Sequence, residues 1–168
     1  AKIAQAFSME VVVHARPRHK KWIESEGFLY APTIEDAAKG ADFISFHTGL
    51  GAPIPESGKF ENEGMIGESV LNALNDGAVL INYDRGEVVD AEALDKVLSS
   101  GKVRYAAIDA DIFKNPDSGE ITGPMAPYLD LEKKHSGKLE LLPHAAADTE
   151  HVSRVEGAKQ AVDQIFSV

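Results

Sequence analysis

The stretch that decides the fold is residues 75–94, which read NDGAVLINYDRGEVVDAEAL. Mainly apolar residues fill positions 79–83 without the polar alternation of a half-exposed strand, and this predicts a strand buried on both faces. A turn that carries Arg85 follows, and a helix is predicted over 91–98. Asp90 stands where a helix N-cap is expected, because a short oxygen-bearing side chain can accept the unpaired amide hydrogens there. Strand, turn and helix in this order are typical of a parallel α/β sheet.

The same alternation extends in both directions along the chain. Short apolar runs predict further strands at 11–14, 42–47, 105–109 and 139–143. Amphipathic patterns predict helices at 20–26, 34–39, 66–74 and about 149–166. Glycines stand where several of these helices should stop, at Gly27, Gly40, Gly77 and Gly101. This β-α-β-α order predicts an α/β fold with a doubly wound, Rossmann-like parallel sheet.

Length and composition exclude several classes of protein. With 168 residues, of which 43% are hydrophobic and 26% charged, the chain is long enough for one well-buried domain. No apolar run approaches the roughly 20 residues that a membrane-spanning helix needs, so we expect no membrane partner. The absence of cysteine excludes disulfides, thiolate metal sites and cysteine nucleophiles, and it suits the cytoplasm. A net charge of −10 repels phosphate backbones, so no nucleic acid partner is expected.

Two proline-rich stretches interrupt the alternation of strands and helices. Residues 49–64 and 115–137 are predicted to be long loops, and each follows the carboxyl end of a predicted strand. Long loops in a compact domain usually have a function or are mobile. Open α/β sheets gather their ligands at the carboxyl ends of the strands, so both stretches are expected beside a ligand site.

The first seven residues place four apolar side chains on one face of a predicted helix, namely Ala1, Ile3, Ala4 and Phe7. In a dinucleotide-binding fold, the first strand and a glycine-rich turn come directly before such a helix. The G-x-G triplet at 49–51 is followed by two prolines and cannot open a helix, so we expect an ordinary loop there. We therefore expect residues 1–168 to form a partial dinucleotide-binding domain.

Two residues at predicted strand ends are candidates for chemistry. The rigid guanidinium of Arg85 can hold a carboxylate through two hydrogen bonds. The alternative is a surface arginine that pairs with Asp84 or Glu87. His144 follows the last predicted strand, and its imidazole can exchange a proton near neutral pH. The alternative there is a loop histidine with an ordinary hydrogen bond.

Five segments together resemble the nucleotide-binding domain of the D-isomer-specific 2-hydroxyacid dehydrogenases. They are AKIAQAFSMEVVVHARP at 1–17, ADFISFHTGL at 41–50, the stretch at 75–94, GKVRYAAIDADIF at 101–113 and LLPHAAADT at 141–149. The third is the most specific, because it resembles the family's strand, arginine turn and following helix. The last resembles the family's Pro-His motif. By overall motif similarity, the resemblance is to phosphoglycerate-dehydrogenase-like members.

The resemblance implies a role for each matching residue. Arg85 would bind and polarise the carboxylate and 2-oxo group of a small 2-hydroxy or 2-oxo acid. His144 would pass a proton to or from the 2-hydroxyl while a hydride moves at the nicotinamide of NAD or NADP. Asp109 would hold the nicotinamide carboxamide, and the loop that follows His47 would line the cofactor crevice. Family members commonly form homodimers, so a homodimer is expected here too.

One departure from the family concerns a carboxylate that orients the catalytic histidine and raises its pKa. The family position is occupied by Lys114 when counted from Asp109, and lies near Pro116 when counted from Asp111. A lysine beside the histidine would lower the pKa of the imidazole by charge repulsion. Three carboxylates remain open as substitutes, namely Asp111, Asp117 and Glu120.

A second departure follows the predicted strand at 11–14. NAD-binding members usually carry an acidic residue there for the ribose hydroxyls. This chain instead has His14, Arg16 and Arg18, followed by further basic residues. Loss of the acid together with gain of arginines favours the 2′-phosphate of NADP. The alternative is a solvated basic patch, with NAD as the cofactor.

Two classes of function remain open. An NAD(P)-dependent oxidoreductase explains why both Arg85 and His144 are present. A non-catalytic dinucleotide-sensing or corepressor-like scaffold would explain Lys114 at the family's carboxylate position, because a binding scaffold needs no such acid. The resemblance also implies a substrate domain, which lies outside this chain in a longer polypeptide. We expect a cytoplasmic enzyme, and we expect this chain alone to be inactive because its cofactor-binding fold is partial.

Overall fold

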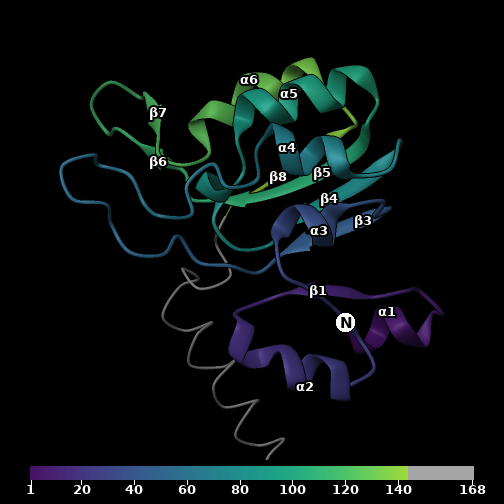
Figure 1. Cartoon of the computed structure of the whole chain (residues 1–168). Helices are drawn as coiled ribbons and strands as arrows, with labels where there is room; N and C mark the ends of the chain where they lie inside the picture. Colours follow the sequence, from purple (N-terminus) through teal and green to yellow (C-terminus); the bar gives the residue numbers. More distant parts are fainter. Residues whose placement is uncertain (144–168) are drawn as a thin grey trace, which may run out of the picture.

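The computed structural model describes residues 1–143, which Figure 1 shows in colour. Its α-helices are α1 (Lys2–Ala6), α2 (Lys20–Ser25), α3 (Ile34–Ala38), α4 (Glu68–Ala73), α5 (Ala91–Ser100) and α6 (Leu129–Lys134). Short 3-10 helices are η1 (Pro17–His19), η2 (Gly86–Val88) and η3 (Ala126–Tyr128). The strands are β1 (Val12–His14), β2 (Leu29–Ala31), β3 (Phe43–Phe46), β4 (Ala78–Asn82), β5 (Val103–Ala110), β6 (Phe113–Lys114), β7 (Ile121–Thr122) and β8 (Leu139–Pro143).

The larger sheet contains β3, β4, β5 and β8 in that order, and all neighbouring strands in it are parallel. Figure 1 shows α4, α5 and α6 together on one side of this sheet. Because the strands are parallel, their carboxyl ends meet at one edge, where the segments after β3, β4 and β5 begin. The predicted α/β fold with a parallel sheet is confirmed.

The stretch at 75–94 folds as its sequence predicts and forms the centre of this sheet. β4 is almost wholly buried between β3 and β5. Asp90 caps α5, because its Oδ1 accepts the amide hydrogen of Ala93 at 2.8 Å. The helix ends at Gly101, whose φ of 79° lies in the left-handed region that glycine adopts without strain.

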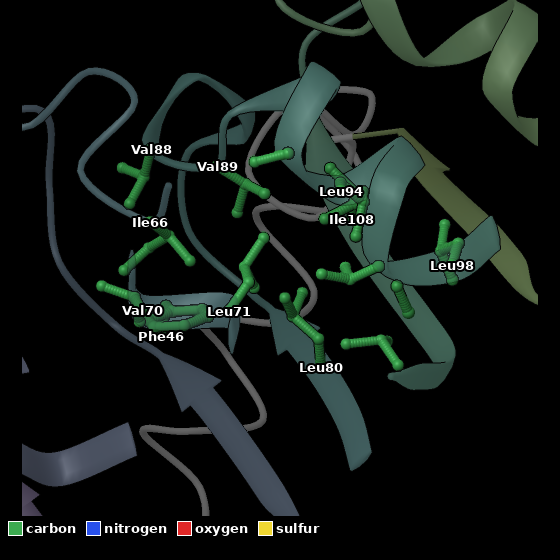
Figure 2. Packing of buried hydrophobic residues seen from close by; sticks show 14 of the residues in the cluster. Phe46, Ile66, Val70, Leu71, Leu80, Val88, Val89, Leu94, Leu98 and Ile108 are labelled. Atoms are coloured by element: carbon green, nitrogen blue, oxygen red, sulfur yellow. The ribbon is translucent and has the colours of Figure 1, made fainter. Parts of the chain in front are cut away.

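The hydrophobic core lies between this sheet and its covering helices. Figure 2 shows side chains from β3, α4, β4, α5 and β5 meeting in one cluster. Leu80, Leu94 and Ile108 are fully buried there. Complete burial of one such side chain stabilises a fold by about 1.5–3 kcal/mol, so this cluster fixes the sheet edge on which the candidate site lies.

β1 and β2 form a separate parallel pair. Within residues 1–143, β1 pairs only with β2, and β3 pairs only with β4. Val12 of β1 and Phe43 of β3 are 38% and 55% exposed, although strands inside a parallel sheet are normally buried on both faces. The described residues therefore contain two separate parallel sheets, the four-stranded one and the β1–β2 pair, besides the antiparallel β6–β7 hairpin.

Several details differ from the sequence predictions. The expected loop at 115–137 contains β7, η3 and α6, and the hairpin of β6 and β7 opens this stretch of chain. β2 is a strand that the sequence reading missed, because three residues are too short to show a period. The helix predicted at 66–74 begins only at Glu68, since Ile66 forms a bridge with Val89. The loop at 49–64, with its G-x-G triplet, is confirmed as a loop.

Candidate functional site

The turn that carries Arg85 lies at the carboxyl end of β4, between the strand and η2. The Arg85 side chain is 38% exposed, and its Nη1 lies 3.6 Å from Oδ2 of Asp111. In the described part of the chain, this guanidinium pairs with Asp111 and with neither Asp84 nor Glu87. The guanidinium is accessible and its charge is only loosely matched.

Buried side-chain and backbone contacts hold this turn. Asn82 is completely buried, its Nδ2 donates to the carbonyl of Arg85 at 2.8 Å, and its Oδ1 accepts from the amide of Asp84 at 3.1 Å. Gly86 packs so closely against β5 that a Cβ there would lie 2.6 Å from the Cβ of Ala110. Only glycine fits at this position, because any side chain there would collide with Ala110.

Asp109 lies on β5 directly beside the Arg85 turn. It is 7% exposed, and its carbonyl oxygen would lie 3.4 Å from a Cβ on Gly86. The structure therefore brings two of the predicted site residues, Arg85 and Asp109, to the same edge of the sheet. A buried aspartate and an exposed guanidinium at one edge of the sheet suit an amide group and a carboxylate group, respectively.

The basic segment, residues 14–18 at the end of β1, is hydrogen-bonded to β2 but has exposed arginines. Nδ1 of His14 lies 3.1 Å from the carbonyl of Ala31, and since a carbonyl only accepts, this nitrogen carries the hydrogen. The hydroxyl of Tyr30 donates to the carbonyl of Ala15 at 3.2 Å. Both bonds connect the segment to β2, while Arg16 and Arg18 remain exposed. His14 thus has a structural contact, and the two arginines are available for a phosphate.

His47 follows β3 at the same sheet edge, and its Nε2 lies 2.8 Å from Oγ of Ser45. The next residue carries a signal that the sequence alone does not show: Oγ1 of Thr48 is buried and has no hydrogen-bond partner among residues 1–143. Because buried polar atoms are nearly always paired, this hydroxyl is consistent with a bound ligand at the edge. Within residues 1–143, no group of three His, Asp or Glu side chains is placed to hold a metal ion.

These observations test the fit of a dinucleotide to the described residues. The two ends of such a molecule, the nicotinamide and the adenosine, find suitable groups here. These are the unpaired Thr48 hydroxyl, the buried Asp109 and the exposed Arg16 and Arg18. The triplet at 49–51 lies in a loop and does not open a helix, so the glycine-rich cradle for a pyrophosphate is not found among residues 1–143. The described residues fit the ends of the cofactor better than its centre.

The position that carries Lys114 lies on the hairpin and not in a buried site. Lys114 is exposed on β6, and its backbone pairs with Ile121 of β7. Asp117 and Glu120 lie in the turn of the same hairpin. Of the three carboxylates left open by the sequence, Asp111 is the one that the structure places beside Arg85. His144 and the helix predicted over 149–166 lie outside the described residues.

Comparison with known proteins identifies the fold and the family. Residues 1–126 match the family described as D-isomer specific 2-hydroxyacid dehydrogenase, NAD binding domain. A glyoxylate reductase of Aeropyrum pernix is 32% identical over 99% of this chain and 44% of its own length. A D-3-phosphoglycerate dehydrogenase of Methanocaldococcus jannaschii is 28% identical over 93% of this chain and 26% of its own length. This chain therefore spans less than half of either relative.

A solved structure agrees with this family. The NADPH-dependent glyoxylate/hydroxypyruvate reductase of Sinorhizobium meliloti, in complex with NADP and malonate, matches with a TM-score of 0.58 and 27% identity. The match covers 91% of this chain and 40% of that one. NAD and NADP are thus both represented among the proteins to which this chain is similar. The chain belongs to the D-isomer specific 2-hydroxyacid dehydrogenase family, and its first 126 residues correspond to the NAD-binding domain of that family.

Proposed function

We propose that this chain is the cofactor-binding part of an NAD(P)-dependent oxidoreductase that moves a hydride between the nicotinamide and a small 2-hydroxy or 2-oxo acid. The observation that carries the proposal is the Arg85 guanidinium, exposed at the carboxyl edge of the sheet on a turn held by buried contacts. A fixed guanidinium fork suits a carboxylate because it can donate two parallel hydrogen bonds. Membership of the family supports the same reaction.

In this proposal, Arg85, His144 and Asp109 each have a separate role. Arg85 binds the substrate carboxylate and polarises the 2-oxo group. His144 gives a proton to the substrate oxygen during reduction and removes it during oxidation, because an imidazole exchanges protons near neutral pH. Asp109 accepts a hydrogen bond from the carboxamide of the cofactor. The bound nicotinamide supplies or accepts the hydride.

NADP is the cofactor that we propose in preference to NAD. The support is the pair of exposed arginines, Arg16 and Arg18, on a segment that two hydrogen bonds connect to β2. Two guanidinium groups at this position favour a dianionic 2′-phosphate over a ribose hydroxyl.

The partial dinucleotide-binding domain that the sequence predicts is also part of the proposal. The separate β1–β2 pair and the exposed edge residues Val12 and Phe43 support a further strand between β1 and β3, supplied with the glycine-rich turn and the substrate domain by a longer polypeptide. The 44% coverage of the Aeropyrum relative supports this as well. We expect the isolated 168-residue chain not to reduce glyoxylate, pyruvate or hydroxypyruvate, and detectable NAD(P)-dependent reduction by it would contradict this part.

The experiment that tests the function is a His144→Ala substitution in the complete protein. An oxidoreductase loses turnover of 2-oxo acids by roughly 100-fold or more, while it still binds the cofactor. The second candidate, a dinucleotide-sensing scaffold, is favoured by the exposed Lys114 on the hairpin. That candidate gains support if the unmodified protein binds NADP or NAD but turns over no 2-oxo acid.

A cytoplasmic homodimer completes the proposal. The absence of cysteine suits a reducing compartment. Ile3 of α1 and Phe7, directly after α1, are 77% and 75% exposed, and an apolar face of this kind is available for a second copy. In the described part of the chain, no helix is long and apolar enough to cross a membrane. Sedimentation of the complete protein tests the dimer, and a monomer at micromolar concentration contradicts it.

A further inference from the structure

Tyr128, at the end of η3, makes a contact that the proposed chemistry does not use. The residue is 2% exposed, and its hydroxyl lies 2.8 Å from the carbonyl of Gly86 and 2.6 Å from that of Val89. A phenol has one hydrogen, so the two carbonyls share a single donor. These carbonyls belong to the turn that begins at Arg85.

The Tyr128 hydroxyl completes the hydrogen bonding of that turn. The carbonyl of Arg85 accepts from Asn82 and from the amide of Val88, and that of Gly86 accepts from the amide of Val89. The carbonyls of Glu87 and Val88 accept hydrogen bonds from the amides of Gly64 and Ile66, which lie in the preceding loop. In the described part of the chain, the donor found for the carbonyl of Val89 is the Tyr128 hydroxyl. A buried carbonyl without a partner is unfavourable, so loss of this hydroxyl loosens the turn.

The surroundings keep the hydroxyl protonated. Burial raises the pKa of Tyr128, and the negative charges of Asp90 and Glu87 raise it further. An ionised oxygen would also face two carbonyl oxygens at hydrogen-bond distance. Tyr128 therefore acts as a donor throughout the ordinary pH range.

The segment that precedes Tyr128 contacts Arg85 at its other end. Asp111, near the start of this segment, lies 3.6 Å from the guanidinium, and its carbonyl accepts the amide hydrogen of Met125 at 3.0 Å. One segment thus contacts the Arg85 turn twice, through the Asp111 carboxylate at the Arg85 side chain and through the Tyr128 hydroxyl at the carbonyls of Gly86 and Val89. We propose that Tyr128 is a positioning residue that fixes the Arg85 turn and thereby the direction of the guanidinium. The carboxylate-binding role of Arg85 in this inference rests on the proposed function.

The experiment compares Tyr128→Phe with Tyr105→Phe in this chain. Tyr105 also donates its hydroxyl to one partner, Glu140, but it lies near the amino end of β5, away from the turn. Native-state hydrogen exchange is measured at the amides of Val88 and Val89, relative to the amide of Leu80 in the same sample. We expect the ratio to rise roughly tenfold in Tyr128→Phe, because one buried hydrogen bond is lost, and to stay unchanged in Tyr105→Phe.

The relative measurement separates positioning from general stability. A purely structural role speeds exchange at Leu80 as much as in the turn, so an unchanged ratio in Tyr128→Phe overturns the inference. A second readout is the side-chain Nε–H signal of Arg85 during a titration with oxalate, a dicarboxylate. We expect oxalate binding to weaken about tenfold in Tyr128→Phe only. If oxalate leaves this signal unmoved in the complete protein, with its substrate domain present, the proposed carboxylate site is wrong. The exchange ratio still decides the role of Tyr128, with the same two outcomes.

Discussion

The Arg85 turn and the basic segment after β1 both follow a parallel strand, but they are built in different ways. Each carbonyl of the turn, from Arg85 to Val89, has a hydrogen-bond donor, and the turn packs against a four-stranded sheet. The basic segment follows a strand of three residues in a two-stranded sheet, and its arginines are exposed. The first region is held in place before a ligand arrives, and the second contributes mainly charge.

This difference predicts how each region responds to change. A packed turn loses its geometry when one atom is added or one hydrogen bond is removed, since its neighbours leave no room for adjustment. A charged surface segment weakens gradually and depends on the salt concentration. The substitutions below test this contrast, in order of decreasing effect.

Gly86→Ala breaks the packed region most directly. The added methyl group would lie 2.6 Å from the Cβ of Ala110, and both residues are buried. We expect the free energy of unfolding in urea to fall by about 2–3 kcal/mol, as in overpacked cores. Gly49→Ala is the control, because nothing lies within 4 Å of a Cβ there. An equal loss in both variants would mean that Gly86 has no special constraint of space.

Arg85→Lys keeps the charge at the turn but removes the planar fork. We expect oxalate binding, measured by calorimetry, to weaken roughly 10- to 100-fold, because hydrogen bonds to charged groups contribute about 1.5–3 kcal/mol. Arg104→Lys on β5 is the matched control, since Arg104 is exposed and outside the turn. Unchanged affinity in Arg85→Lys would remove Arg85 from the proposed site.

The double substitution Arg16→Gln with Arg18→Gln tests the charged region. We expect the affinity for adenosine 2′-monophosphate to fall about five- to tenfold at low salt, and the affinity for adenosine 5′-monophosphate to change less. The difference should shrink at high salt because both arginines are exposed. If the double substitution affects both nucleotides equally, the preference for NADP is wrong.

Asp95→Asn tests a contact away from the site, between α5 and α6. Asp95 accepts hydrogen bonds from Lys134 and from His135, and these hold the pKa of its carboxyl below the usual value. A lowered pKa means that this stabilisation is present above the usual aspartate pKa and is lost as the pH falls through the folded value. We expect Asp95→Asn to reduce the free energy of unfolding by about 0.2–1 kcal/mol at pH 7 and to have almost no effect near pH 2.

Asp130→Asn is the control for this smallest effect. Its carboxylate pairs with Lys133 on the same short helix, where both side chains are highly exposed. Equal pH profiles for the two variants would show that the contact between α5 and α6 contributes nothing beyond a surface ion pair.

The sequence predicted those parts of the fold that depend on neighbouring residues. The strand, turn and capped helix of 75–94 are visible locally, because apolar runs, Asp90 and Gly101 each act within a few residues. The sequence did not predict β2 or α6: β2 is a strand of only three residues, and α6 lies in a stretch where prolines and mixed charges dominate. Long loops were expected where the chain forms the β6–β7 hairpin and η3, because prolines and mixed charges dominate there.

The candidate site was predicted as single residues and not as a connected arrangement. The position of Arg85 follows from its strand, but its pairing with Asp111 depends on contacts between β4, β5 and the segment after β5. Tyr128 contacts Gly86 and Val89, which lie 42 and 39 positions before it in the sequence. No local pattern indicates such a contact. The unpaired hydroxyl of Thr48 likewise becomes visible only once burial is known.

The two open strand edges have a consequence for handling the chain. Within residues 1–143, β1 and β3 each carry a row of backbone donors and acceptors on the side away from their single partner, next to the exposed Val12 and Phe43. Such edges are templates for intermolecular β-pairing. We therefore expect strand addition at these edges in concentrated solutions of this chain, and a short extended peptide that occupies the edges should act as a solubility aid.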